Sequence, residues 1–274
     1  MKYFTHIIMS IIILFLICYL IIKQCFETRF KYNFVKQSCK YLYVFVSCTK
    51  YSKRWSNLQN IMKFLGGEYI IIKGGAIEKR EGDIVTLKCD DSYAGLPGKI
   101  MCACKYVSIH YPGYGIIKID DDINIHERLE AHMSGHHYCG WRVHRTPPNP
   151  RWHIGRVPNS SWNDIEYKHG EWTTHNNIPY KYQYADGGAI YSLSNYAVSW
   201  ISNSNIDPDK CIYEDVMIGG ILAQSNIHPK HLYGLTVYGG RGTGDGYDSY
   251  ATQSQKLIIR YKNKNIIQLD DSTH

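Results

Sequence analysis

The seven residues Ile116–Asp122, with the sequence IIKIDDD, join an apolar run to three consecutive carboxylates. The isoleucines predict a buried strand, and the aspartates fall where it ends. Alternate side chains of an extended segment share a face, so we expect Asp120 and Asp122 to point together and Asp121 to point away. Two carboxylates on one face suit Mg²⁺ or Mn²⁺. A solvated acidic turn has the same pattern, so the triplet alone leaves both interpretations open.

Before this stretch, the pattern of apolar residues predicts strands and helices in turn. The sequence YLYVFVS at Tyr41–Ser47 is apolar, β-branched and aromatic, which is typical of a buried strand. We also expect strands at Tyr69–Ile72 and Ile84–Leu87, and helices at Arg54–Leu65 and Lys99–Ser108. This alternation predicts an α/β fold with a mostly parallel sheet, helices on both faces, and ligands at the carboxyl ends of the strands.

Beyond the triplet, apolar spacing predicts four more elements. These are a helix at Asn124–Met133, a strand at Ala189–Leu193, and helices at Asn195–Ile201 and Val216–Gln224. The segment Trp141–Tyr184 is rich in Pro, His, Trp and Asn, which indicates long loops carrying an edge strand. The Gly-rich stretch Gly239–Gly246 does not follow a strand, so we expect a flexible loop there and not a phosphate-binding loop.

The N-terminal run Ile7–Ile22 is nearly uninterrupted in its apolar character. Its length approaches the roughly 20 residues that span a bilayer, so we predict a single transmembrane helix within residues 1–22, retained as an anchor. No pair of small residues follows at a cleavage site, which argues against a signal peptide; a buried core helix is the third alternative. Residues 23–40 are polar and basic and indicate a stem, after which residues 41–274 form the globular domain.

The net charge of +7 lies mostly near the N-terminus. Residues 1–40 carry +5 and leave +2 for the rest, so we expect no nucleic-acid partner. Five Lys or Arg follow the apolar run, and this bias favours a cytosolic domain. Nine cysteines and the glycosylation triplet Asn159–Ser161 favour a lumen instead. We predict a type II single-pass membrane protein of the Golgi or ER lumen, with the charge bias against that orientation.

A second acidic motif, YEDVMIG at Tyr213–Gly219, sets two acids among apolar residues. Buried surroundings raise the pKa of a carboxyl group and make it a better base. Sugar transfer with inversion needs such a base for the acceptor hydroxyl, by analogy with inverting hydrolysis. Asp215 is the candidate base, with Glu214 beside it in the catalytic site. Two acids also favour the start of a helix, so this segment alone leaves both interpretations open.

Paired glycines at Gly187 and Gly188 precede a predicted strand. Glycine allows a close approach of the backbone to a ligand, although a tight turn alone would explain the pair. A structural zinc site is disfavoured, because only one residue separates Cys102 from Cys104. We expect disulfides in a lumen or free buried thiols in the cytosol. Among the tryptophans of the loop region, Trp172 is the candidate for stacking on a sugar, and core packing is the alternative.

In order and spacing these motifs resemble the β1,3-galactosyltransferase-like glycosyltransferases, a family that includes N-acetylglucosaminyl members and the fringe enzymes. Family members carry the segment Asp-x-Tyr-x-Asn-Leu-x-x-Lys, which Asp91–Lys99 matches except at Gly95. An aspartate triplet, a Gly-Gly segment and a Glu-Asp-Val-x-x-Gly segment follow, and they resemble Ile119–Ile123, Gly187–Leu193 and Glu214–Gly219. The resemblance covers roughly residues 42–225.

The resemblance implies a GT-A fold and metal-dependent, inverting transfer of a hexose from a UDP-sugar to a hydroxyl of a glycan or glycoprotein. The hexose would be galactose or an N-acetylhexosamine, and the metal Mn²⁺, with Mg²⁺ possible. The implied roles are as follows: Asp215 and Glu214 catalytic; Asp120, Asp122 and His231 metal ligands; Asp91, Lys99, Asp120, Asp121, Gly187 and Gly188 at the donor; Asp186 and Trp172 at the acceptor.

Two departures from the family pattern leave the donor sugar open. Gly95 replaces the family's Asn, and the usual arginine cluster after the first strand is thinned to Lys53 and Arg54. A non-catalytic carbohydrate-binding protein that keeps the fold is the alternative function. The intact triplet and Asp215 argue against it.

Overall fold

The computed structural model describes residues 15–20, 23, 40–145, 182–211, 213–232, 235–238 and 257–261. The chain divides into two units, residues 1–38 and 39–274. In the first unit, residues 15–20 are helical and expose large apolar side chains such as Phe15 and Leu20. No helix in the part of the chain that the structure describes has both the length and the apolar character needed to cross a membrane. Most of the predicted anchor lies outside the described residues.

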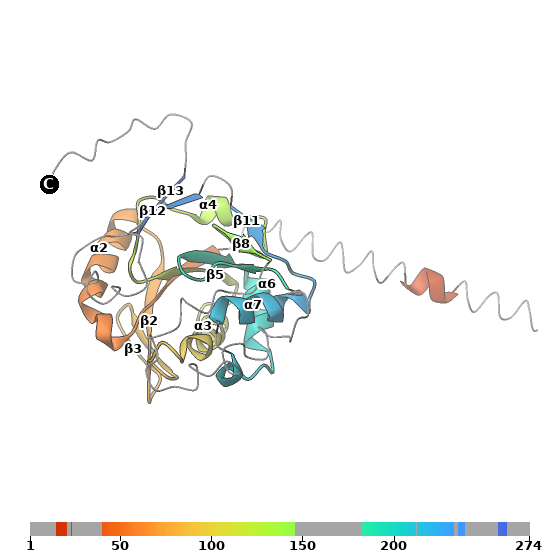
Figure 1. The fold of residues 1–274 in the computed structure, drawn as a ribbon, viewed down its shortest axis with the longest axis horizontal. Helices are drawn as coiled ribbons and strands as arrows, with labels where there is room; N and C mark the ends of the chain where they lie inside the picture. Colours follow the sequence, from red (N-terminus) through yellow and green to blue (C-terminus); the bar gives the residue numbers. More distant parts are fainter. Residues whose placement is uncertain are drawn as a thin grey trace, which may run out of the picture. The chain divides into compact units, whose positions relative to one another are not determined.

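The second unit is built on a mixed sheet whose centre is parallel (Figure 1). The four central strands run parallel to one another and lie in the order β4, β2, β1, β5. On the far side of β5, β10 runs antiparallel between β5 and β7. The bounds of the strands are β1 Lys40–Val46, β2 Tyr69–Gly75, β3 Lys79–Glu81, β4 Ile84–Lys88, β5 Tyr114–Asp120, β7 Tyr138–Gly140, β10 Ile190–Leu193 and β11 Lys230–His231. The predicted α/β fold with a mostly parallel centre is confirmed.

Alternation along β1 divides the core into two layers, one on each face of the sheet. Leu42, Val44 and Val46 belong to one cluster and Tyr43 and Phe45 to the other, because successive side chains of a strand point to opposite faces. The helices are α2 Trp55–Leu65, α3 Leu96–His110, α4 Glu130–Met133, α6 Asn195–Ser202 and α7 Glu214–Ala223, with 3-10 turns η1 Thr49–Arg54 and η5 Pro208–Lys210.

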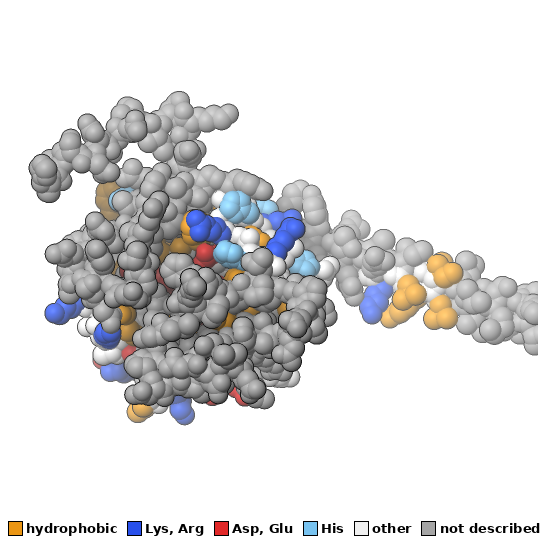
Figure 2. Space-filling model, in the orientation of Figure 1, with side chains coloured by type: hydrophobic (Ala, Val, Ile, Leu, Met, Phe, Trp, Pro, Cys, Tyr) orange, Lys and Arg blue, Asp and Glu red, His pale blue; other side chains and the backbone are white. Residues whose placement is uncertain are grey.

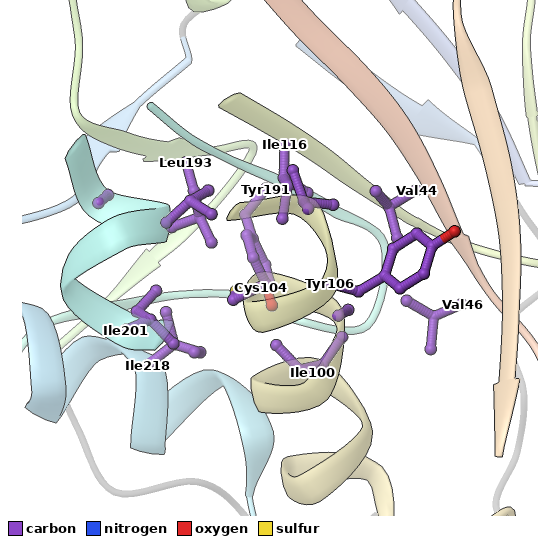
Figure 3. Packing of buried hydrophobic residues seen from close by; sticks show 14 of the residues in the cluster. Val44, Val46, Ile100, Cys104, Tyr106, Ile116, Tyr191, Leu193, Ile201 and Ile218 are labelled. Carbon is purple, nitrogen blue, oxygen red and sulfur yellow. The ribbon is translucent and has the colours of Figure 1, made fainter. Parts of the chain in front are cut away.

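Three helices, α3, α6 and α7, cover the face of the Val44 cluster, as Figure 1 shows. Their side chains, such as Ile100, Ile201 and Ile218, belong to the same buried cluster as Val44 and Ile116 of the sheet (Figure 3). On the opposite face, α2 contributes its buried Leu58 and Met62 to the Tyr43 cluster. Both faces of the sheet are therefore shielded from water, which explains why most residues of its central strands are apolar.

Local signals set the ends of the helices. Helix α2 ends at Gly66, whose φ of +71° is accessible to glycine at little cost. Helix α6 begins after Ser194, whose side chain accepts the N–H of Ala197. Helix α3 begins three residues earlier than predicted, at Leu96, because Pro97 fits the first turn of a helix.

The predicted helix at Asn124–Met133 is wrong over its first half. Ile123–Ile125 instead form strand β6, which pairs in parallel with β13, Leu257–Tyr261. Strand β13 also pairs antiparallel with β12, Leu235–Tyr238. Only the last turn is helical, as α4. A pairing partner more than 130 residues away overrides the local spacing, which was compatible with a helix.

The predicted loop region is described only at its two ends. There, β8 Val143–His144 pairs antiparallel with β9 Tyr184–Ala185. Trp172 lies outside the described residues, as does the stretch Gly239–Gly246.

The connections of β1 and β5 create a point where the strand order reverses. The chain runs from β1 outward through β2 to β4 and then returns to β5 on the other side of β1. In the register of β1 and β5, Val46 at the carboxyl end of β1 lies opposite Asp120 at the carboxyl end of β5. Open α/β sheets bind ligands in the crevice at such a point. The aspartate triplet lies directly at its rim.

Candidate active site

Asp120 occupies the last position of β5 and pairs with a buried lysine of the same strand. The Lys118 Nζ lies 2.6 Å from the Asp120 Oδ1, and the Lys118 side chain is 1% exposed. Burial alone would lower the pKa of Lys118, but the carboxylates of Asp120 and Glu214 outweigh it and raise the pKa. Burial, with the charges of Asp122 and Glu214, raises the pKa of Asp120 to about 7 against the effect of Lys118. Asp120 therefore lies in a crowded acidic site with one buried cation.

Gly187 connects this pair to the second acidic motif. The Lys118 ammonium donates to the carbonyl oxygen of Gly187, and the Gly187 N–H donates to the Asp215 Oδ2 over 3.2 Å. A Cβ on Gly187 would lie 2.9 Å from the Asp215 Cβ and would overlap the Glu214 carboxylate. The absence of a side chain at Gly187 is thus required for the turn to approach the start of α7.

The Asp215 carboxyl group occupies the first turn of α7, facing the Gly187 turn. Its other oxygen accepts the N–H of Val216 over 2.8 Å. Burial, followed by the negative charge of Glu214, raises the pKa of Asp215 to about 7, although these two backbone N–H groups oppose the shift. A carboxyl group in this range can take up and release a proton near neutral pH.

Glu214, which precedes Asp215, is buried and held by a tyrosine. The Tyr191 hydroxyl donates to the Glu214 Oε1 over 2.5 Å, and both side chains belong to the interior, with exposures of 0% and 5%. Burial and the adjacent Glu214 charge raise the pKa of Tyr191 far above its usual value, so the phenol stays protonated and donates. Glu214 therefore has a fixed position, whereas its neighbour Asp215 borders the turn.

Asp121 turns away from Asp120 toward the end of β1. Its two oxygens accept from the Ser47 hydroxyl at 2.6 Å and from the Arg54 guanidinium at 2.5 Å. The Trp55 indole N–H donates to the same hydroxyl of Ser47 over 2.7 Å. Asp120 and Asp121 thus face different partners, as expected, although β5 ends at Asp120 and Asp121 lies in the turn that follows the strand. The Asp121 carboxylate joins β5 to η1 at the point of strand reversal.

Asp91 and Lys99 form a brace at the ends of β1 and β2. The Lys99 Nζ lies 2.9 Å from the Asp91 Oδ1 and donates to the carbonyl oxygen of Ser47 over 2.8 Å. The Asp91 carboxylate also accepts the N–H groups of Thr49, at 2.8 Å, and Gly74, at 2.6 Å. Burial opposes ionisation, but these donors outweigh it and lower the pKa of Asp91. The predicted donor residues thus meet at the same edge as the triplet.

Asp186 begins the Gly187 turn and contacts a histidine. Its Oδ1 accepts the N–H of Gly188 over 2.9 Å, and its Oδ2 lies 3.2 Å from the His144 Nε2. The His144 ring stacks on Tyr184, with centroids 5.2 Å apart. The negative charge of Asp186 contributes to the raised pKa of Asp215. Asp186 therefore lies beside the candidate base.

Asp122 and His231 are the other two predicted metal ligands. Asp122 is half-buried in the turn after β5 and lies near both other aspartates, since its charge raises the pKa of each. His231, on edge strand β11, is three strands from β5, about 14 Å at about 4.8 Å per strand. Among the described residues, no group of three His, Cys, Asp or Glu side chains is arranged to hold a metal ion. Asp120 and Asp122 nevertheless offer the hard oxygen atoms that Mn²⁺ and Mg²⁺ prefer.

Sequence reasoning missed several residues that connect the predicted ones, namely Ser47, Lys118, His144 and Tyr191. The signal for Lys118 was present, because a lysine amid isoleucines of a buried strand needs an anionic partner. His144 had no comparable signal. In the space-filling view, several His and Lys or Arg side chains lie together on the upper part of the second unit, beside a small acidic area (Figure 2).

Comparison with known proteins places this geometry in a family. Residues 71–233 match the family model described as galactosyltransferase. This span begins in β2, ends just after β11, and includes every candidate residue from Asp91 to His231. No curated protein matches the chain. Since the match covers more than half of the chain, the protein belongs to the galactosyltransferase family of glycosyltransferases.

Proposed function

We propose that the protein is an inverting, metal-dependent transferase that moves a hexose, galactose or an N-acetylhexosamine, from a UDP-sugar to a hydroxyl of a glycan or glycoprotein. One observation carries the proposal. The two acidic motifs are joined through Gly187, whose carbonyl accepts from Lys118, the partner of Asp120, and whose N–H binds Asp215. In this proposal the site for a diphosphate and the base for an acceptor would lie on opposite sides of one glycine.

The donor half of the site would be built at the end of β5. Asp120 and Asp122 would hold Mn²⁺ or Mg²⁺, and the cation would supply positive charge against the departing diphosphate. His231 is the further ligand that the resemblance implies, and it would have to reach across the two strands that lie between β11 and β5. Lys118 fixes the Asp120 carboxylate from the buried side. Asp121 and the Asp91–Lys99 brace hold the neighbouring strand ends at the nucleotide, and Gly187 and Gly188 allow the donor a close approach.

The acceptor half would be the start of α7. Asp215 takes the proton of the acceptor hydroxyl on its carboxylate while that oxygen attacks the anomeric carbon opposite the leaving diphosphate, which gives inversion. A pKa of about 7 matches this task, because the carboxylate is available near neutral pH and gains a stable proton. Glu214 raises that pKa through its charge. Asp186, and Trp172 outside the described residues, would contact the acceptor.

The same proposal includes a membrane location. The apolar run Ile7–Ile22 would anchor the chain, with residues 23–40 as the stem and residues 41–274 in the Golgi or ER lumen. Protease added to intact vesicles from expressing cells tests this orientation. Protection of the domain until detergent is added is expected, and cleavage in intact vesicles would contradict the lumenal location.

Release of UDP tests the activity directly. The purified protein is incubated with a panel of UDP-hexoses and Mn²⁺, with and without chelator, and released UDP is measured. We expect one or a few donors to give metal-dependent release, which Asp122→Ala abolishes. The matched control is Glu81→Gln, an exposed carboxylate on edge strand β3, which should retain full activity. No UDP from any donor would overturn the proposal and favour the non-catalytic carbohydrate-binding alternative.

A further inference from the structure

Two cysteines lie against each other outside the residues proposed for transfer. Cys89 follows β4, and its carbonyl oxygen accepts the N–H of Gly75 over 2.9 Å. Cys102 lies in α3, where its Sγ is 4.0 Å from the carbonyl oxygen of Lys88, the residue before Cys89. The Cys102 Sγ therefore lies beside the peptide bond that joins Lys88 to Cys89, and the two half-buried thiols are near enough to shift each other's pKa. These contacts place the Cys102 sulfur beside the backbone at Cys89.

Two other described cysteines, Cys104 and Cys139, have different surroundings. Cys104, two residues after Cys102, is 1% exposed and packs in the Val44 cluster. The Cys139 thiol lies 2.9 Å from the hydroxyl of Ser192. Burial raises the pKa of both thiols, to about 11 for Cys139, so neither is prone to form a thiolate.

The pKa of the Cys102 thiol is lowered instead of raised. The neighbouring Cys89 thiol, followed by the positive charge of Lys105, lowers the pKa of Cys102 to about 7 against burial and the charge of Glu78. The thiolate is the reactive form in disulfide exchange, and a thiol whose pKa is near the ambient pH reacts best. The pKa of Cys89 is raised by its interaction with Cys102 and by burial, so Cys89 remains a thiol while Cys102 forms the thiolate.

We propose that Cys89 and Cys102 form a disulfide bond that closes the segment carrying Asp91 and Lys99. The oxidant is a second disulfide, such as that of oxidised glutathione or a thiol oxidoreductase. The Cys102 thiolate attacks one sulfur of that disulfide, whose S–S bond breaks to release one thiol. The Cys89 sulfur then attacks Cys102 in the mixed disulfide and releases the second thiol. Two protein thiols are oxidised and one disulfide is reduced to two thiols, with protons conserved.

The bond would have a specific structural effect. It ties the end of β4 to the second turn of α3. The segment between the two cysteines, which includes the first turn of α3, contains both Asp91 and Lys99. A cross-link of this length stabilises mainly by restricting the unfolded chain. Because thiol pairing is measured on the protein itself, the inference does not depend on the proposed transfer.

Peptide mapping tests the pairing. The full chain is equilibrated with oxidised glutathione, denatured, alkylated without reductant and digested. We expect the Cys89 and Cys102 peptides to be linked, with the mass of the two reduced peptides less two hydrogens, while Cys104 and Cys139 are alkylated. Recovery of alkylated Cys89 and Cys102, or a link from either to another cysteine, would overturn the proposal.

Thermal unfolding provides a second test. The oxidised protein should have a Tm roughly 5–10 °C above that of the same protein treated with a phosphine reductant, from the entropy of a loop of this length. The double variant Cys89→Ser/Cys102→Ser should lose this difference. Cys104→Ala, a control in the same helix, should lower both Tm values and keep the difference. A redox-dependent shift of equal size in the double variant would refute the pairing.

Discussion

Asp91 and Asp215 are two half-buried carboxyl groups at the same end of the sheet, and they differ in the charges around them. Each accepts two backbone N–H groups. Asp91 also contacts the ammonium group of Lys99, and its pKa is lowered. Asp215 has Glu214 and Asp186 as neighbours, and its pKa is raised to about 7. Burial raises the pKa of both carboxyl groups and is the largest effect on each. At Asp91 the ammonium group and the N–H donors outweigh burial, which gives a permanent anion that braces loops, whereas at Asp215 the negative neighbours add to burial and give a group that can exchange a proton.

The largest effect is expected when Asp215, the carboxyl group that can exchange a proton, is replaced. Asp215→Asn keeps the shape of the side chain and removes the base, so the rate of transfer should fall by about 10²–10⁴-fold. The rate is measured with the UDP-sugar found in the release assay. Donor binding, followed by thermal shift with Mn²⁺, should be unchanged. Transfer within tenfold of the parent would show that Asp215 is not the base.

The next largest effect concerns Lys118, the buried lysine that contacts both Asp120 and Gly187. Lys118→Met leaves Asp120 without its buried partner, and we expect a loss of about 3 kcal/mol in the free energy of unfolding, measured with urea. This is the lower end of the usual range, because the Asp120 side chain is 29% exposed. Adding Asp120→Asn should restore part of the loss. If the double variant is no more stable than Lys118→Met, the two side chains are not coupled.

Gly187 tests how closely the turn approaches the start of α7. In Gly187→Ala the new Cβ lies 2.9 Å from the Asp215 Cβ, and we expect the variant to lose about 2 kcal/mol of stability. Gly188→Ala is the matched control, since its nearest neighbour is the Asp186 Oδ1 at 3.2 Å, and it should lose less than about 1 kcal/mol. Equal losses in the two urea titrations would contradict the close approach at Gly187.

The smallest effect is expected at Asp91, the carboxylate whose pKa is lowered. Asp91→Asn removes the ion pair with Lys99, and at pH 7 we expect a loss of about 1.5 kcal/mol in unfolding free energy. Because the folded pKa of Asp91 is lowered, its contribution is complete above the unfolded value of 3.8 and disappears as pH falls toward the folded pKa. The difference between parent and variant should therefore shrink below about pH 4. A difference independent of pH would show that the lost contact is not ionic.

The first half of the fold was predictable because local and global preferences agree there. The runs at β1, β2, β4 and β5 are apolar on both faces, and the sheet buries both. At Ile123–Ile125 the two disagree. The spacing fits a helix, but the strand pairs with β13 from the far end of the chain, which no local window contains.

The candidate site was predictable in its residue types and not in its connections. The acidic triplet and Asp215 follow from their patterns, whereas the link through Gly187 depends on β10 lying antiparallel beside β5. Likewise, the role of Asp121 depends on Arg54 and Ser47, more than sixty residues earlier in the chain. Sequence spacing cannot supply these partners, because they are set by the order of strands in the sheet.

The register of β10 also limits how the chain can change in length. Tyr191 is paired with Lys118 in the sheet, and this register lets the Tyr191 hydroxyl reach Glu214 on the face that α3, α6 and α7 cover. A single residue inserted between Ala185 and Ile190 that shifted the pairing would turn Tyr191 to the opposite face. The mostly exposed link between α6 and η5 has no such constraint. Natural or engineered length variation should therefore be excluded from the four residues before β10 and tolerated after α6.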